Sequence, residues 1–158
     1  MDRYQWLVFL HITGAFLLLG GIVVSAVFSV AALRRERPSE IALLFGLTRW
    51  ATPAIGIGML VTLGFGLWLV HHVDYIGWGD AWVIASLALW LASGALGDRG
   101  GRLWRETQKL AARLAAQGDA PSPELRARVR DPVALALNGG SALAALAILA
   151  LMIWKPGA

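Results

Sequence analysis

Four long stretches of the sequence contain no Asp, Glu, Lys or Arg, and they limit what this chain can fold into. They cover residues 4–33, 50–73, 81–97 and 132–154. A membrane-spanning helix needs roughly 20 mostly apolar residues, and only the third stretch is shorter than that. Open strands would leave their backbone groups unpaired in lipid, so the sequence predicts four membrane-spanning helices.

The order of these stretches predicts an all-α fold, a four-helix transmembrane bundle with up-down-up-down topology. We expect residues 1–158 to form a single integral-membrane domain. The composition agrees, because 58% of the residues are hydrophobic and only 15% are charged, against about a quarter charged in soluble domains. The chain has no Cys, which excludes disulfides and any site that needs a thiolate.

Basic residues are concentrated in two of the connections between the spans. The connection that follows span 50–73 has no Lys or Arg. Short loops rich in Lys and Arg stay in the cytoplasm, so both termini should lie outside a bacterial plasma membrane. These charges set topology and meet anionic lipid, and we expect the lipid bilayer rather than nucleic acid as their partner. The basic residues of the two connections are Arg34, Arg35, Arg37, Arg49, Arg99, Arg102, Arg105, Lys109, Arg113, Arg126, Arg128 and Arg130.

The segment between the third and fourth spans, residues 98–131, predicts a cytoplasmic amphipathic helical segment. Apolar positions recur there at helical spacing, at Leu103, Leu110 and Leu114. Gly118 suits the position just after a helix, and a short helix should begin near Ser122. This segment can dock a partner or lie on lipid headgroups. On the other connection, Ser39 is predicted to cap a helical lead-in to the second span.

Small residues recur at four-residue spacing in every span, as in Gly58, Thr62 and Gly66. Such spacing lets two helix backbones approach closely in lipid. It predicts tight packing within the bundle and makes a homodimer plausible. Asn138 is expected to form an interhelical hydrogen bond.

His11 is the ionisable side chain deepest in any span. An imidazole there needs a partner, which leaves a structural hydrogen bond, a cofactor or metal, or a proton relay. His11 is therefore a candidate ligand of haem b. A metal site formed by His11, His71, His72 and Asp74 is a second candidate. Since His71 and His72 lie nearer the membrane surface, they are poorly placed as a second axial ligand.

The opening Trp6-Leu-Val-Phe-Leu-His11 and the glycine-rich run after it resemble an uncharacterised bacterial four-helix integral-membrane family of the domain-of-unknown-function type. Trp50-Ala-Thr-Pro53 and residues 130–138 extend this resemblance along most of the chain. More distantly, the first span is similar to copper-resistance protein D and to the J-type protoporphyrinogen oxidase. The latter resemblance implies haem b binding at His11. It does not extend to the Lys on which that oxidase relies in its third helix, because residues 81–97 contain none.

Two classes of function remain open from the sequence. One is a redox protein that binds haem b or a metal through His11. The other is a non-enzymatic membrane protein, which would be an accessory subunit, a small permease or an oligomerising scaffold. The sequence does not decide whether the protein is an enzyme. All carboxylates lie outside the predicted spans, so no general acid–base pair is predicted within the membrane.

The distribution of basic residues predicts the outcome of reporter fusions. A fusion at Gly118 should report the cytoplasm, and a fusion at Ala158 should report the outside, because the loop that contains Gly118 is rich in Lys and Arg. Phosphatase and fluorescent-protein fusions measure this directly. An external signal at Gly118 would contradict the predicted orientation.

Overall fold

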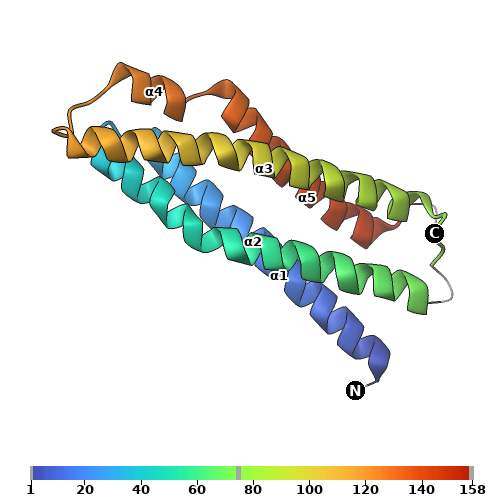
Figure 1. Ribbon diagram of the computed structural model, residues 1–158. Helices are drawn as coiled ribbons and strands as arrows, with labels where there is room; N and C mark the ends of the chain where they lie inside the picture. The colour runs from blue at the N-terminus through green and yellow to red at the C-terminus, as the bar shows by residue number, and fades with distance from the viewer. Residues whose placement is uncertain (1, 74–75, 157–158) are drawn as a thin grey trace.

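The computed structural model describes residues 2–73 and 76–156, which form five helices (Figure 1). The helices are α1 (Arg3–Leu33), α2 (Pro38–His72), α3 (Ala81–Ala116), α4 (Pro123–Val129) and α5 (Pro132–Trp154). The described residues contain no strand. The chain offers four candidate spans, in α1, α2, α3 and the α4–α5 region, that are long and apolar enough to cross a membrane. The predicted all-α fold with four spans is therefore confirmed.

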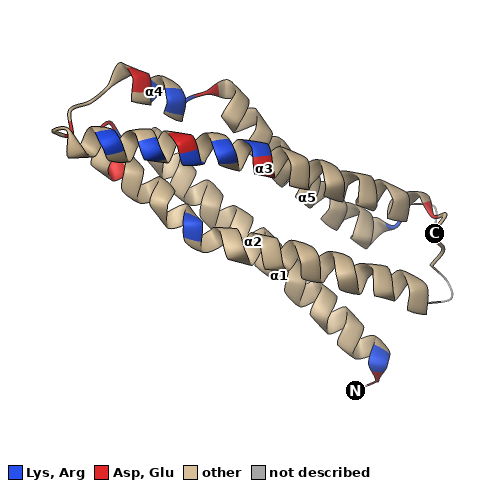
Figure 2. Cartoon of the chain, viewed as in Figure 1, with Lys and Arg blue, Asp and Glu red and all other residues tan. Residues whose placement is uncertain are grey.

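The long helices alternate in direction, so the molecule has two distinct ends. Both ends of the chain and the α2–α3 connection lie at one end, here called the terminal end (Figure 1). The α1–α2 turn, the last part of α3 and α4 lie at the other end. Most of the charged residues are found at this second end, here called the charged end (Figure 2). The positions of the helices thus follow the up-down-up-down order.

Helix α2 begins at Pro38, where the sequence predicted Ser39 as the cap. Arg37 is the N-cap residue and contributes no side-chain hydrogen bond, while proline occupies the first turn. Proline suits this place because its missing N–H would have had no partner within the helix. The predicted lead-in and the second span are therefore one continuous helix of 35 residues.

Helix α3 continues without a break from the third uncharged stretch to Ala116. Glycine in a helix interior is normally unfavourable, so the three glycines within residues 97–101 need a reason. The reason is that α5 lies against two of them. A Cβ added at Gly97 would lie 2.9 Å from Ser141 Oγ, and one at Gly100 would lie 2.6 Å from Asn138 Cγ. Close packing of two helices explains these glycines.

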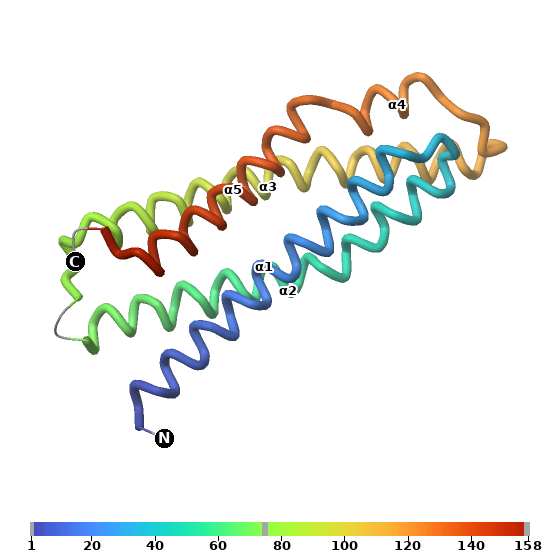
Figure 3. The backbone as a smooth tube through the Cα atoms, turned by 180° about the vertical axis from the view of Figure 1, so that it is seen from behind, coloured from blue at the N-terminus to red at the C-terminus, as the bar shows by residue number. Residues whose placement is uncertain are grey.

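The four long helices associate as two pairs, α1 with α2 and α3 with α5, which meet where α2 contacts α3. Viewed from behind, α1 and α5 diverge toward the terminal end (Figure 3). Within the first pair the backbones come very close. A Cβ added at Gly58 would overlap the backbone nitrogen of Leu18 and lie 2.7 Å from the carbonyl oxygen of Gly14.

The predicted contact between small residues of neighbouring helices is confirmed for Gly58 and Thr62 of α2. It also includes Gly14 of α1, which the four-residue spacing did not identify. Thr62 faces α1, where a Cβ added at Gly14 would lie 2.6 Å from the Thr62 nitrogen. By contrast, nothing lies within 4 Å of the Cβ position of Gly56 or Gly64. Glycine content alone therefore did not distinguish the packed face of α2 from its exposed face.

The second pair is joined by two serines that exchange hydrogen bonds. Ser93 Oγ donates to the carbonyl oxygen of Ser141 at 3.0 Å, and Ser141 Oγ donates to that of Ser93 at 2.9 Å. The two hydroxyl oxygens lie 3.2 Å apart. Each hydroxyl thus finds a partner across the interface, which matters most where water cannot supply one.

The charged end has its own apolar core, here called the head core. Phe45 packs against Trp104 with ring centroids 5.7 Å apart. Because this core lies beside the most charged part of the chain, it is stabilised as the core of a soluble protein is. Its buried residues come from four helices and are Ala32, Ile41, Phe45, Ala111, Leu125 and Val129.

The close approach of α1 and α2 predicts how two glycine substitutions differ. Gly58→Ala should lower the free energy of unfolding by about 1–3 kcal/mol, because its Cβ overlaps the backbone of α1. Gly56→Ala is the matched control, since its Cβ meets open space two residues away. Thermal unfolding in detergent measures both. Equal melting temperatures for the two variants would contradict the packing described for Gly58.

Candidate functional site

His11 lies on the face of α1 that packs against α2. Its Nδ1 atom lies 2.8 Å from the backbone carbonyl oxygen of Thr62. A carbonyl oxygen can only accept a hydrogen bond, so Nδ1 carries the hydrogen and donates it. In the neutral ring the other nitrogen, Nε2, then has a lone pair and no hydrogen. The contact with Thr62 therefore fixes both the orientation and the tautomer of the imidazole.

Gly66 provides the space for the ring. A Cβ at this position would lie 3.0 Å from His11 Cε1 and 3.1 Å from His11 Nδ1. Such distances are tighter than ordinary van der Waals contact, so a larger residue would press on the imidazole. Thr62 and Gly66 are site residues that the sequence indicated only as helix-packing positions.

Two polar atoms at this site have no partner among the described residues. His11 is half-buried, and Nδ1 makes its single described hydrogen bond, which leaves Nε2 without one. Thr62 Oγ1 is buried and likewise makes no hydrogen bond within the described chain. An unpaired polar atom within a membrane costs free energy. Nε2 would therefore gain from a partner, which can be a metal ion, a haem iron or a hydrogen-bond donor.

The other two histidines lie apart from His11. His71 and His72 are exposed in the last turn of α2, five and six residues beyond Gly66. At about 1.5 Å per residue this places them roughly 8 Å further along the helix. Asp74, the fourth predicted metal ligand, falls outside the described residues. Within residues 2–73 and 76–156, no three His, Asp or Glu side chains gather closely enough to hold a metal ion.

Asn138 does not form the interhelical hydrogen bond that the sequence predicts for it. Its Nδ2 atom donates to the carbonyl oxygen of Ala134 at 2.8 Å, within its own helix rather than across to another. The amide packs against Gly100, where a Cβ would lie 2.8 Å from Asn138 Oδ1. Since glycine offers no side-chain partner, the amide uses the carbonyl four residues earlier in α5.

Two buried polar side chains lie close together on one helix near the terminal end. Trp82 and Ser86 are one helical turn apart on α3, and both are buried. Neither Trp82 Nε1 nor Ser86 Oγ has a hydrogen-bond partner among the described residues. Lys155 Nζ lies over the Trp82 ring, 5.7 Å from the ring centroid, which is a cation–π distance.

Ionic and polar contacts at the charged end join segments that are far apart in the sequence. Asp119 accepts hydrogen bonds from the backbone nitrogen and the hydroxyl of Ser39, both at 2.7 Å. These bonds lower the pKa of the Asp119 carboxyl, the hydroxyl having the larger effect. Glu36 accepts from Arg126 at 2.6 Å, so the α1–α2 turn is also tied to α4.

A local ion pair lies where α3 leaves the third uncharged stretch. Arg102 donates to Asp98 four residues earlier in the same helix. The hydrogen bond from Arg102 lowers the pKa of Asp98. Both side chains are exposed, so this pair adds little to stability.

Comparison with known proteins agrees with this architecture. Residues 5–156 match the family described as "Predicted integral membrane protein (DUF2269)". The chain belongs to the DUF2269 family. This match confirms the predicted membership of an uncharacterised membrane family. No curated protein and no solved structure matches the chain. Membership of DUF2269 thus identifies an integral membrane protein and assigns no activity to His11.

The Asp119 contacts predict a pH dependence. The folded-state pKa of Asp119 lies below its ordinary value of about 3.9, so its stabilising effect is present above that value. The effect is lost as the pH falls through the lower, folded-state pKa. Asp119→Asn should therefore lower the melting temperature at pH 7 and lose this difference under acid conditions. Thermal unfolding at a series of pH values from 7 downward measures how this difference shrinks once the pH falls below the ordinary pKa.

Ser39→Ala is the control for this prediction, because it removes the hydroxyl donor and keeps the backbone donor. In the Ser39→Ala background, the melting temperature of the Ser39→Ala variant is compared with that of the double variant Ser39→Ala/Asp119→Asn. The pH-dependent effect of Asp119→Asn on the melting temperature should be smaller there than in the otherwise unaltered protein. An equal effect in both backgrounds would show that the Ser39 hydroxyl does not hold the Asp119 carboxylate.

Proposed function

We propose that this protein binds haem b through Nε2 of His11 and serves as a redox protein in the membrane. The observation that carries the proposal is the hydrogen bond from His11 Nδ1 to the Thr62 carbonyl oxygen at 2.8 Å. Histidines that ligate metals usually donate their other ring hydrogen to a carbonyl or a carboxylate, which orients the ring and raises its basicity. His11 has this arrangement, with Nε2 left as the ligand atom.

The residues at the site fit a haem held by one protein ligand. His11 would supply the axial nitrogen, Thr62 would hold the ring through its carbonyl group, and Gly66 would leave room for the imidazole. When bound, haem b would supply one-electron chemistry. His71 and His72 lie at a different depth, so a second histidine ligand from this chain is not part of the proposal.

A second support is the resemblance to the J-type protoporphyrinogen oxidase that the sequence of the first span suggests. It implies haem b at the position of His11, in the span where the hydrogen bond to Thr62 is found. The third span lacks the Lys on which that oxidase relies, so oxidase activity is not proposed.

A second candidate is a non-enzymatic role as an accessory subunit, a small permease or an oligomerising scaffold. It is favoured by the head core, an ordered apolar core at the charged end that has no need of a cofactor. In this case the hydrogen bond from His11 would serve only to hold α1 against α2.

An absorption spectrum distinguishes the two candidates. Protein purified from haem-replete cells should show a Soret band, and His11→Ala should abolish it, because the ligand atom is lost. His71→Ala and His72→Ala should retain the band, since both side chains lie away from His11. A spectrum recorded with pyridine identifies the haem type.

A pair of glycine variants sharpens this test. Gly66→Ala should reduce haem retention, because its Cβ would press on the imidazole of His11. Gly64→Ala is the matched control, since its Cβ meets nothing within 4 Å. A colourless wild-type protein that gains no absorbance on titration with haem would refute the redox proposal. His11→Ala would then cost only about 1 kcal/mol, as for a typical interhelical hydrogen bond in a membrane.

A further inference from the structure

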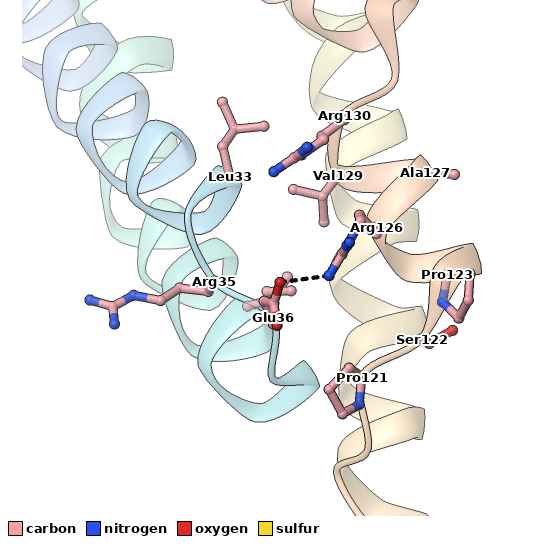
Figure 4. A pocket seen from close by; sticks show the side chains of 11 residues that line it. Leu33, Arg35, Glu36, Pro121, Ser122, Pro123, Arg126, Ala127, Val129 and Arg130 are labelled. Carbon is pink, nitrogen blue, oxygen red and sulfur yellow. Dashed lines mark hydrogen bonds and ion pairs between the residues drawn. The ribbon is translucent and has the colours of Figure 1, made fainter.

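A pocket of about 470 Å³ lies at the charged end, between the α1–α2 turn and α4 (Figure 4). Its lining combines apolar side chains, such as Leu33 and Val129, with charged ones. The charged residues are Arg35, Glu36, Arg126 and Arg130. The pocket is distinct from the His11 site, which lies between α1 and α2 nearer the terminal end.

The two arginines of the α4 region that line this pocket differ in whether their charge is paired. Arg126 is paired with Glu36 at 2.6 Å, so its charge is balanced. The side chain of Arg130 extends across the pocket toward Leu33, whereas that of Arg35 points away (Figure 4). Among the described residues, the Arg130 guanidinium makes no hydrogen bond or ion pair. Arg130 therefore leaves an unbalanced positive charge and unused donors in the pocket.

The pocket lies where the first and fourth uncharged stretches end. Leu33 is the last residue of α1, and Arg130 precedes the first residue of α5 by two positions. Lipid phosphates lie just outside the hydrocarbon core on either face of a bilayer, so a pocket beside the ends of spans can meet them in either orientation of the chain. The apolar wall at Leu33 continues into α1, which can contact an acyl chain.

We propose that this pocket binds the phosphate group of an anionic phospholipid, with Arg130 as the main ligand. Guanidinium groups bind phosphate oxygens through paired, charge-assisted hydrogen bonds. A phosphate that is attached to acyl chains satisfies both the arginine and the apolar wall, whereas inorganic phosphate satisfies only the arginine. The ion pair of Glu36 with Arg126 limits the positive charge of the pocket, so Glu36 opposes binding.

Binding of phosphatidylglycerol to the purified full-length protein in detergent tests this proposal, with phosphatidylcholine as the neutral reference. Arg130→Gln should weaken phosphatidylglycerol binding about fivefold, the effect of one arginine near an anionic headgroup. Arg128→Gln is the matched control, because it removes the same charge from α4 and does not line this pocket. Its effect on the affinity should be clearly smaller than that of Arg130→Gln.

Glu36→Gln provides a test that a folding defect cannot imitate. It removes the acidic residue of the pocket and frees Arg126, so it should tighten phosphatidylglycerol binding. Equal weakening by Arg130→Gln and Arg128→Gln, or weaker binding in Glu36→Gln, would overturn the proposal. Full competition by millimolar inorganic phosphate would also overturn it, in favour of a site for the free anion. The Soret band is independent of these outcomes.

Discussion

Close contact between the backbones of α1 and α2 is the interaction on which the other features of this protein depend. Lipid tails are as apolar as the side chains that they surround, so burying leucine does not draw two spans together. Backbone approach and hydrogen bonds must do so instead. Gly14 and Gly58 allow the approach, and the bond from His11 to Thr62 lies within the same interface. The position of the imidazole is thus a consequence of how tightly the two helices pack.

The two ends of the molecule are held together by different forces. In the spans, polar contacts are few, and the exchange between Ser93 and Ser141 is the clearest of them. At the charged end, the head core buries apolar side chains beside water and is surrounded by ionic contacts such as Glu36 with Arg126. The chain therefore combines a membrane-type interface and a soluble-type core along the same helices.

Much of the fold could be predicted from the sequence because it depends on local patterns. Span lengths follow from uncharged runs, and Gly118 is found just after α3 with a φ of 121°, as its place in the sequence indicated. Asp131 caps α5 through its bond to the Val133 nitrogen, two residues away. These features need only the residues within a few positions of one another.

The site contacts were not predictable in the same way, because they join distant segments. The bond of His11 spans 51 positions, that of Asp119 to Ser39 spans 80, and that of Arg126 to Glu36 spans 90. Helical spacing identifies which residues share a face, but it does not identify the facing residue on another helix. The sequence therefore predicts His11 as a candidate site residue without its partner, and it predicts Ser39 as a helix cap because Asp119, the acceptor of its hydrogen bonds, lies 80 positions away.

Away from the head core, the seam between the two helix pairs is weaker than the contacts within either pair. Between α2 and α3, the described hydrogen bond at span level is from Trp90 Nε1 to the Met59 carbonyl oxygen, at 3.4 Å. Relative rotation of the pairs about this seam would break neither the bond of His11 nor the serine exchange. The molecule therefore resembles two arms joined at the charged end by the head core, and its packing offers little resistance to a motion that widens the angle between α1 and α5 at the terminal end.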